Sequence, residues 1–173
     1  MSLELLLLRH AKSSWADPGR PDHDRPLNDR GRRAAPLMGR LVRRLDRLPD
    51  VVLSSDSRRT RETVDLWSSG ADWNGPVEWL PDLYHASADR LERTLRGVED
   101  GARVMLVAHN PGIETFATRL AGTDVPMPTA TLAIFDTPGD AWGDLVVDAS
   151  RTVGVWRPRD LTDPPEDATP ARR

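Results

Sequence analysis

Short apolar runs that alternate with helical apolar stripes dominate the hydrophobic pattern of this chain. The runs at 5–8, 51–53 and 104–108 have the length and composition typical of strands buried on both faces of a sheet. Between them, apolar residues recur at helical spacing over 34–45 and 91–98. Strands that alternate with helices predict a three-layer α/β domain.

Capping and turn residues place the boundaries of these elements. Asn28 and Ser87 suit helix N-caps, and the sequence around Pro111 and Gly112 turns the chain into another helix. The last two strands are expected to be antiparallel at a sheet edge, which 153–156 either extends or covers. The predicted strands lie at 3–8, 50–55, 77–80, 103–109, 131–135 and 144–148, and the predicted helices run over 28–48, to about Ser69, over 87–98 and through Leu120.

Length and charge restrict the class of protein. The chain has 173 residues, enough for one domain with a substantial core, and we assign 1–157 to that domain. Residues 158–173 are proline-rich, charged and nearly without apolar side chains, which predicts a disordered C-terminal tail. The net charge of -3 gives no basic field for nucleic acid. Cysteine is absent, which excludes disulfides and thiolate metal sites.

The N-terminal apolar run does not look like an export signal. It is too short to span a membrane, and it lacks the basic start and the small-residue cleavage site of a signal peptide. We therefore expect a cytoplasmic protein that binds neither a membrane nor nucleic acid.

Basic and polar residues follow three of the buried runs. Arg9 and His10 end the first, Arg59 follows the second across a serine-rich turn, and His109 ends the third. Because ligands bind beyond the carboxyl ends of parallel strands, these side chains are expected to share one anion site. Taken alone, the first strand end fits a solvated turn with an incidental histidine equally well. Arginine repels metal cations and no glycine-rich nucleotide loop is present, so we expect neither metal nor cofactor.

Neighbouring residues are weaker candidates. Lys12 is the one lysine among 24 basic residues and stands two positions from His10. Thr60 is placed beside Arg59 to point into the same site. The loop at 17–26 either forms a wall of the pocket or is a solvated connection. Arginines off the apolar stripe of the first helix are surface residues or a docking face for an acidic or phosphorylated partner.

Three ordered motifs resemble the histidine phosphatase superfamily, with its phosphoglycerate mutase-like fold. They are Leu-Leu-Arg9-His10-Ala-Lys-Ser, Ser54-Ser55-Asp-Ser-Arg-Arg59-Thr-Arg-Glu-Thr63 and Val-Ala-His109-Asn-Pro-Gly. The stretches at 25–33 and 83–86 resemble the small bacterial branch, the SixA-type phosphohistidine phosphatases. The resemblance covers about residues 3–150 and implies a three-layer α/β/α sandwich with a mostly parallel central sheet.

The resemblance also implies roles for the residues that carry it. His10 would be a nucleophile that forms a phosphohistidine intermediate, with its other ring nitrogen held by a backbone carbonyl. Arg9, Arg59 and a protonated His109 would bind the phosphoryl oxygens, so that no metal is required. Further candidate substrate-binding residues are Ser13, Lys12 and His85.

The sequence departs from the family pattern at several positions. Ala11 stands where glycine is common, Ala16 where larger members have asparagine, and Thr60 where alanine is usual. Larger members also supply a glutamate general acid about where this chain has 83–85. No carboxylate is expected there unless Asp82 reaches in. Other carboxylates, better explained as loop or helix-start charges, are Asp17, Asp24 and Glu114.

The missing glutamate favours one class of substrate. An alkoxide leaves poorly without a proton donor, whereas the imidazole of phosphohistidine can carry a proton on its distal nitrogen and leave neutral. We therefore predict a phosphatase for phosphohistidine on a protein, such as a histidine-phosphotransfer domain. The alternatives are a phosphomonoesterase for a small phosphorylated metabolite, with His85 or Asp82 as acid, and a catalytically silent phosphate-binding module.

Overall fold

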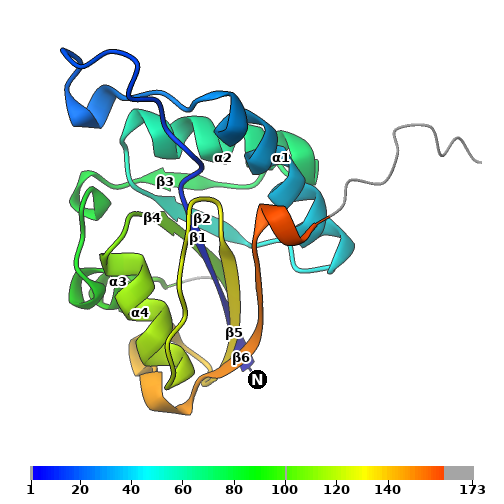
Figure 1. The fold of residues 1–173 in the computed structure, drawn as a ribbon. Helices are drawn as coiled ribbons and strands as arrows, with labels where there is room; N and C mark the ends of the chain where they lie inside the picture. The colour runs from blue at the N-terminus through cyan, green and yellow to red at the C-terminus, as the bar shows by residue number, and fades with distance from the viewer. Residues whose placement is uncertain (1, 100, 162–173) are drawn as a thin grey trace, which may run out of the picture.

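The computed structural model of this protein describes residues 2–99 and 101–161. Within these residues the chain forms one six-stranded sheet in the order β3-β2-β4-β1-β5-β6, with four α-helices packed against it (Figure 1). The strands are β1 (Ser2–Arg9), β2 (Val51–Ser54), β3 (Val77–Trp79), β4 (Arg103–Ala108), β5 (Leu132–Pro138) and β6 (Arg151–Trp156), and the helices are α1 (Asp29–Arg44), α2 (Arg58–Ala71), α3 (Ala88–Arg96) and α4 (Gly112–Ala121).

The sheet is mixed, with its parallel part around the first strand. β1 pairs in parallel with β4, which pairs in parallel with β2, and β2 continues in parallel to β3. On the other side of β1, β5 and then β6 are antiparallel. The parallel strands β1, β2 and β4 therefore end at the same edge, where the predicted site residues follow them.

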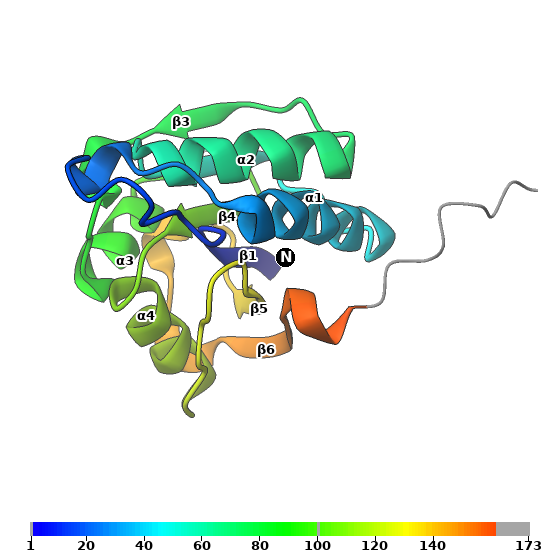
Figure 2. The same cartoon turned by 45° about the horizontal axis from the view of Figure 1, so that its top comes forward.

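Helices cover both faces of the sheet and make the predicted three-layer α/β/α sandwich. α1 and α2 pack on one face, and α3 and α4 pack on the other (Figure 2). β1 contributes to both cores because successive side chains of a strand point to opposite faces. Leu5 and Leu7 face α3 and α4, whereas Leu6 and Leu8 face α1 and α2. Each is at most 1% exposed, and burial of each contributes about 1.5–3 kcal/mol of transfer free energy.

Local capping starts the helices where the sequence predicts. The Asn28 side chain accepts a hydrogen bond from the Gly31 N–H at the start of α1, and the Ser87 side chain accepts one from the Arg90 N–H at the start of α3. Ser57 caps α2 in the same way. Each cap satisfies one of the backbone donors that a helix start leaves free.

The predicted strand at 144–148 is wrong. This segment forms two short 3-10 turns, Trp142–Asp144 and Val147–Ala149, and the edge strand that pairs with β5 is β6. Trp142 and Leu145 are buried in the core beneath α3 and α4, and the Trp142 indole N–H donates to the Gly101 carbonyl at 2.7 Å. Trp142 and Leu145 are three positions apart, so in a strand their side chains would point to opposite faces. Because both side chains enter the same core, the segment does not form a strand.

The described chain continues past the predicted end of the domain at residue 157. Pro158–Asp160 forms a 3-10 turn, and Leu161 is partly buried against the core under α1. The rest of the predicted disordered tail, 162–173, lies outside the described residues. Among the described residues, every helix is too short or too polar to cross a bilayer.

Candidate active site

The ends of β1, β2 and β4 converge on a pocket of about 260 Å³. All seven residues that the sequence analysis proposes for the site line it: Arg9, His10, Lys12, Ser13, Arg59, His85 and His109. The structure thus brings the predicted residues together, and their chemical roles stay predictions. The loop at 17–26 forms a wall of this pocket rather than a solvated connection, because Asp22 and Arg25 from it also line the pocket.

His10 is held as one tautomer of a neutral ring. Its Nδ1 lies 2.7 Å from the Ala11 carbonyl, which can only accept, so Nδ1 carries the proton and Nε2 keeps its lone pair. The side chain is 7% exposed. Burial lowers the pKa of His10 to about 3, opposed by the Ala11 carbonyl and assisted by the charges of nearby arginines, chiefly Arg59.

The turn after β1 is fixed by both helices of its layer. The Ala11 N–H donates to the Thr63 hydroxyl, which in turn donates to the Arg59 carbonyl in α2. On the other side, α1 comes so close that a Cβ on Gly31 would lie 2.2 Å from the Lys12 carbonyl oxygen. Only glycine allows this approach, which packs the Lys12 backbone, two residues beyond His10, against the start of α1.

His109 is arranged as a neutral ring in this structure, and its expected protonation beside a bound phosphoryl group stays a prediction. Its Nδ1 faces Arg59 Nη2 at 3.3 Å, and a guanidinium can only donate, so Nδ1 accepts. Nε2 then carries the proton and donates to the Ser55 hydroxyl at 2.8 Å. Burial, the neighbouring His10 and the Arg59 charge together lower the pKa of His109 far below 6.5.

Arg9 and Arg59 bring two guanidinium groups to the pocket. Arg59 is 3% exposed, and Arg9 donates through Nη1 to the Met127 carbonyl at 3.0 Å. Glu114, one of the predicted alternative acids, accepts from the Asn110 amide and from the Met127 N–H. Glu114 therefore holds the segment that positions Arg9.

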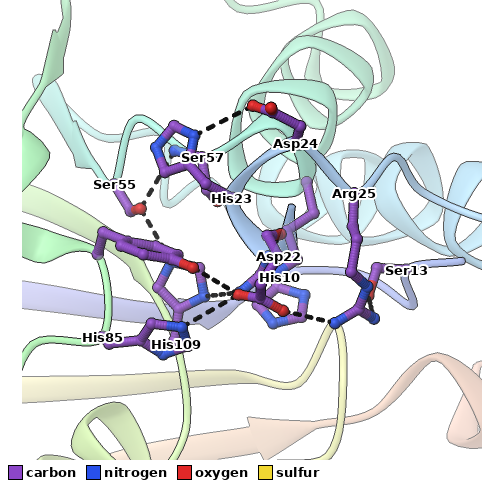
Figure 3. A network of polar contacts seen from close by, with 12 residues as sticks. His10, Ser13, Asp22, His23, Asp24, Arg25, Ser55, Ser57, His85 and His109 are labelled. Atoms are coloured by element: carbon purple, nitrogen blue, oxygen red, sulfur yellow. Dashed lines mark hydrogen bonds and ion pairs between the residues drawn. The ribbon is translucent and has the colours of Figure 1, made fainter. Parts of the chain in front are cut away.

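The residue that sequence reasoning missed is Asp22. Its carboxylate lies in the middle of the pocket (Figure 3), where Oδ2 accepts from Tyr84 Oη at 2.5 Å, Arg59 Nη2 at 3.1 Å and His85 Nε2 at 3.1 Å. Oδ1 accepts from Arg25 Nη1 at 2.8 Å. Although its partial burial acts the other way, the Tyr84 and Arg25 hydrogen bonds and the Arg59 charge lower the pKa of Asp22 below its ordinary value. An ionised carboxylate occupies the anion site.

Arg25 is a second missed residue and links the loop to the predicted Ser13. Its Nη2 donates to the Ser13 hydroxyl oxygen at 2.5 Å, which leaves the hydroxyl proton available to another acceptor. The Trp15 ring covers the Arg25 guanidinium, 3.3 Å from ring centroid to Cζ. The signal for both missed residues was the proline-containing loop at 17–26, which overlaps the start of the 25–33 motif. The charged residues of this loop alternate too regularly to be told apart by sequence.

The remaining predicted residues fall on the rim or outside the pocket. Lys12 is exposed at the rim, and His85 has a positive φ of 52°, an uncommon backbone conformation that recurs at functional sites. The expectation that Thr60 points into the site is wrong, because its hydroxyl donates to the Ser55 carbonyl at 2.7 Å. Carboxylates that pair outside the pocket are Asp82 with Arg90, Asp17 with Arg20 and Asp24 with His23.

The guanidinium groups of the site disfavour a bound metal cation. Among the described residues, no group of three or more histidine, cysteine, aspartate or glutamate side chains is arranged to hold a metal ion. Two arginines, two neutral histidines and a serine hydroxyl around one carboxylate define a pocket for a small oxyanion at the ends of parallel strands. This is the arrangement of an α/β protein that binds or transfers phosphoryl groups.

Comparison with known proteins gives the family. The chain belongs to the histidine phosphatase superfamily, branch 1, whose profile matches residues 5–94. As a member of this superfamily the chain is a phosphatase, an enzyme that removes phosphoryl groups from its substrate by hydrolysis.

Relatives span nearly the whole chain. An uncharacterised chloroplastic protein of Arabidopsis thaliana is 32% identical over 174 residues, which cover 95% of this chain and 79% of the relative. An uncharacterised protein of Mycobacterium tuberculosis is 34% identical over 164 residues, which cover 88% of this chain and all of the relative. The predicted cytoplasmic location stays a prediction.

Solved structures place the chain beside the SixA branch. A protein from Agrobacterium tumefaciens, provisionally named phosphohistidine phosphatase SixA, is 28% identical with a TM-score of 0.79 over 90% of this chain and 97% of its own. A SixA protein from Nakamurella multipartitia, also provisionally named, gives the same identity and TM-score over 91% of this chain and 97% of its own. The protein histidine phosphatase SixA bound to tungstate shares the fold at 19% identity and a TM-score of 0.78.

The two buried rings give a prediction that needs no mutation. In long-range ¹H–¹⁵N spectra, we expect His10 as the Nδ1–H tautomer and His109 as the Nε2–H tautomer, both neutral from pH 8 to 5. His23, whose pKa is raised chiefly by its hydrogen bond to Asp56, should titrate above 6.5. Because the rings of His10 and His109 gain protons near pH 6.5 in the unfolded chain and stay neutral in the folded one, these two rings should lower the free energy of unfolding as pH drops below 6.5. The raised pKa of His23 offsets part of that loss. Titration of His109 near 6.5 would contradict the assigned hydrogen bonds.

The central carboxylate gives a second prediction. Asp22→Asn should tighten the binding of inorganic phosphate and of vanadate about tenfold, because it removes a like charge from beside the bound anion. The measurement is a dissociation constant by calorimetry or by competitive inhibition. Asp24→Asn, at an exposed position two residues away, is the matched control and should leave both constants unchanged. Equal or weaker binding in Asp22→Asn would mean that Asp22 organises the loop and does not compete with the anion.

Proposed function

We propose that this phosphatase hydrolyses phosphohistidine on a protein, through a phosphorylated His10 and without a metal ion. The observation that carries the proposal is the state of Asp22. Among the described residues, Asp22 supplies the one carboxylate that lines the active-site pocket, and because this carboxylate is ionised it has no proton to give to a leaving group. A substrate whose leaving group brings its own proton suits such a site.

The first chemical step uses the free nitrogen of His10. The lone pair on Nε2 attacks phosphorus in line and forms an N–P bond, while the N–P bond of the substrate breaks and its electron pair returns to the leaving imidazole. The distal nitrogen of that imidazole already carries a proton, so the group departs neutral. The Ala11 carbonyl supports this step because it accepts a hydrogen bond from the Nδ1–H group as positive charge develops on the His10 ring.

The second step returns the enzyme to its starting state. Water attacks the phosphoryl group on His10, the N–P bond breaks with its electron pair returning to Nε2, and the water's protons remain on the released phosphate and solvent. The Asp22 carboxylate lies within the same pocket and is available to orient that water.

Fixed charges take the place of a metal ion in both steps. Arg9 and Arg59 supply donors for the non-bridging oxygens, and removal of one such donor typically costs about 10²–10³ in rate. The donors that Arg59 now gives to Asp22 must turn to the phosphoryl group when substrate binds. An incoming phosphoryl dianion also raises the pKa of His109, which would let its ring bind the anion as a cation.

The rim of the pocket supports a macromolecular substrate. Trp15 is 71% exposed beside the opening, and the His85 side chain is 54% exposed. A histidine that protrudes from a folded protein can therefore reach His10, and an exposed tryptophan is a common anchor in protein recognition.

One observation favours a second candidate, a phosphomonoesterase for a small metabolite. The His85 Nε2 faces Asp22 Oδ2 within the pocket, so this ring can present an N–H to a leaving oxygen. His85 would then act as the general acid in place of the missing glutamate.

The experiment that separates these candidates compares substrates side by side. A phosphorylated histidine-phosphotransfer domain and a simple phosphoramidate are tested beside a panel of small phosphomonoesters, with and without EDTA. We expect the phosphohistidine protein to have the highest kcat/KM, activity to persist in EDTA, and vanadate to inhibit. A higher kcat/KM for one of the phosphomonoesters would support the second candidate, and loss of activity in EDTA that magnesium restores would exclude the metal-free reaction.

A further inference from the structure

A second pocket adjoins the active site, and no step of the proposed reaction uses it. It measures about 280 Å³ and lies between the start of α1 and the 3-10 turn at Pro158–Asp160, the orange turn beside α1 in Figure 2. Lys12 and Thr129 line both this pocket and the active-site pocket, so the two are contiguous. A chemical group bound in this second pocket would therefore belong to the substrate molecule in the active site or lie next to it.

The lining of this pocket is strongly cationic, and we refer to it as the cationic pocket. Its charged lining residues are Lys12, Arg30, Arg33, Arg157 and Arg159, and among the described residues no carboxylate lines it. Asp160 lies outside the lining, 4.0 Å from Arg157 and 3.8 Å from Arg159, and offsets part of the charge.

Three of these cations have no partner within the described part of the chain. The side chains of Lys12, Arg30 and Arg33 make neither a hydrogen bond nor an ion pair there. Other arginines of α1 do: Arg32 pairs with Asp29, and Arg43 pairs with Asp72. Arg30 and Arg33 lie at the N-terminal end of this helix and line the cationic pocket, whereas Arg44, which also makes no side-chain contact within the described residues, lies at the other end.

The shape of the lining indicates the kind of anion. The cations come from three separate segments, at 12, 30–33 and 157–159, so several parts of the chain contribute charge to the pocket. Leu37, Pro128 and Pro158 also line the pocket and offer apolar contact. Five cationic side chains together with an apolar part of the lining suit an extended chain that carries several carboxylates on aliphatic stems.

We propose that the cationic pocket binds an acidic segment of the phosphoprotein substrate, adjacent to the phosphohistidine. This inference rests on the proposed function and adds a specificity determinant to it. The attraction acts on capture of the substrate and not on the bond that breaks, so it lowers KM with little change in kcat.

The test uses two phosphohistidine peptides that differ only in charge, one with three glutamates beside the phosphohistidine and one with three glutamines. Wild-type protein should cleave the acidic peptide with a kcat/KM about tenfold higher, the effect of several weak surface ion pairs acting together. The preference should reside in KM and shrink as salt is raised. The double variant Arg30→Glu with Arg33→Glu should reverse the preference, whereas Arg44→Glu, at the far end of the same helix, should retain it.

Each outcome decides one question. Equal kcat/KM for the two peptides in wild type, or an unchanged preference in the double variant, would overturn the cationic pocket as an acidic-segment site. The wild type could instead prefer a small bisphosphate to its monophosphate and show no preference between the peptides. If the double variant abolished that preference, the acidic-segment proposal would be overturned in favour of a site for a second phosphate group. Failure of the proposed function is separate, because neither peptide nor phosphoramidate would then be cleaved.

Discussion

Replacement of His10 by alanine is expected to abolish turnover and to abolish the covalent intermediate with it. The ring is 7% exposed, its Nδ1 proton is bound to the Ala11 carbonyl, and its Nε2 lone pair is free, which is the state a nucleophile requires. Loss of a nucleophile typically removes about 10⁴-fold or more of the rate. Brief reaction with ³²P-labelled substrate, followed by denaturing electrophoresis without acid, should show an acid-labile phosphoprotein in wild type and none in His10→Ala.

Two further variants make this result specific. His23→Ala removes a histidine that pairs with Asp56 and does not line the active-site pocket, so it should retain both label and turnover. His109→Ala should be slow but should still take up label, because its ring faces Arg59 and Ser55. Label that persists in His10→Ala and vanishes in His109→Ala would transfer the nucleophilic role to His109. A thermal melt of each variant separates loss of chemistry from loss of fold.

The second large effect concerns the leaving group. Without a general acid, the rate for phosphomonoesters should depend steeply on leaving-group pKa, so that aryl phosphates react well and alkyl phosphates poorly. The phosphoramidate should react well despite this, because its nitrogen leaves in protonated form. Replacement of His85 by glutamine should then change phosphoramidate cleavage little.

The opposite result has a defined signature. If His85 donates the proton, His85→Gln should slow alkyl phosphates by about 10²–10⁴-fold and activated aryl esters much less. Asp82→Asn is the control, because that carboxylate is exposed and paired with Arg90 outside the pocket. The rate in wild type could instead be nearly independent of leaving-group pKa and become steeply dependent on it in His85→Gln. That result would identify this chain as a metabolite phosphatase and remove the argument for phosphohistidine.

The sequence by itself determined the layers of the fold and the four residues at its strand ends. Continuous apolar runs such as 5–8 and 104–108 can only be satisfied by burial on two faces, and the caps at Asn28 and Ser87 act within a single turn of helix. Such signals depend only on residues close together in the sequence, so they can be recognised without knowing how the rest of the chain folds. The prediction that Arg9, His10, Arg59 and His109 meet followed because parallel strands share one carboxyl edge.

Only the tertiary structure decided what surrounds those four residues. Asp22 contacts Tyr84 and His85 across more than 60 positions of sequence, and no local pattern distinguishes it from Asp17 or Asp24 in the same loop. The neutral state of His109 depends on burial and on a guanidinium that comes from another helix. The irregular path at 142–149 depends on Trp142 filling a gap in the core. Charge state, contact and cavity shape arise from which distant segments meet, and that is settled by packing of the whole chain.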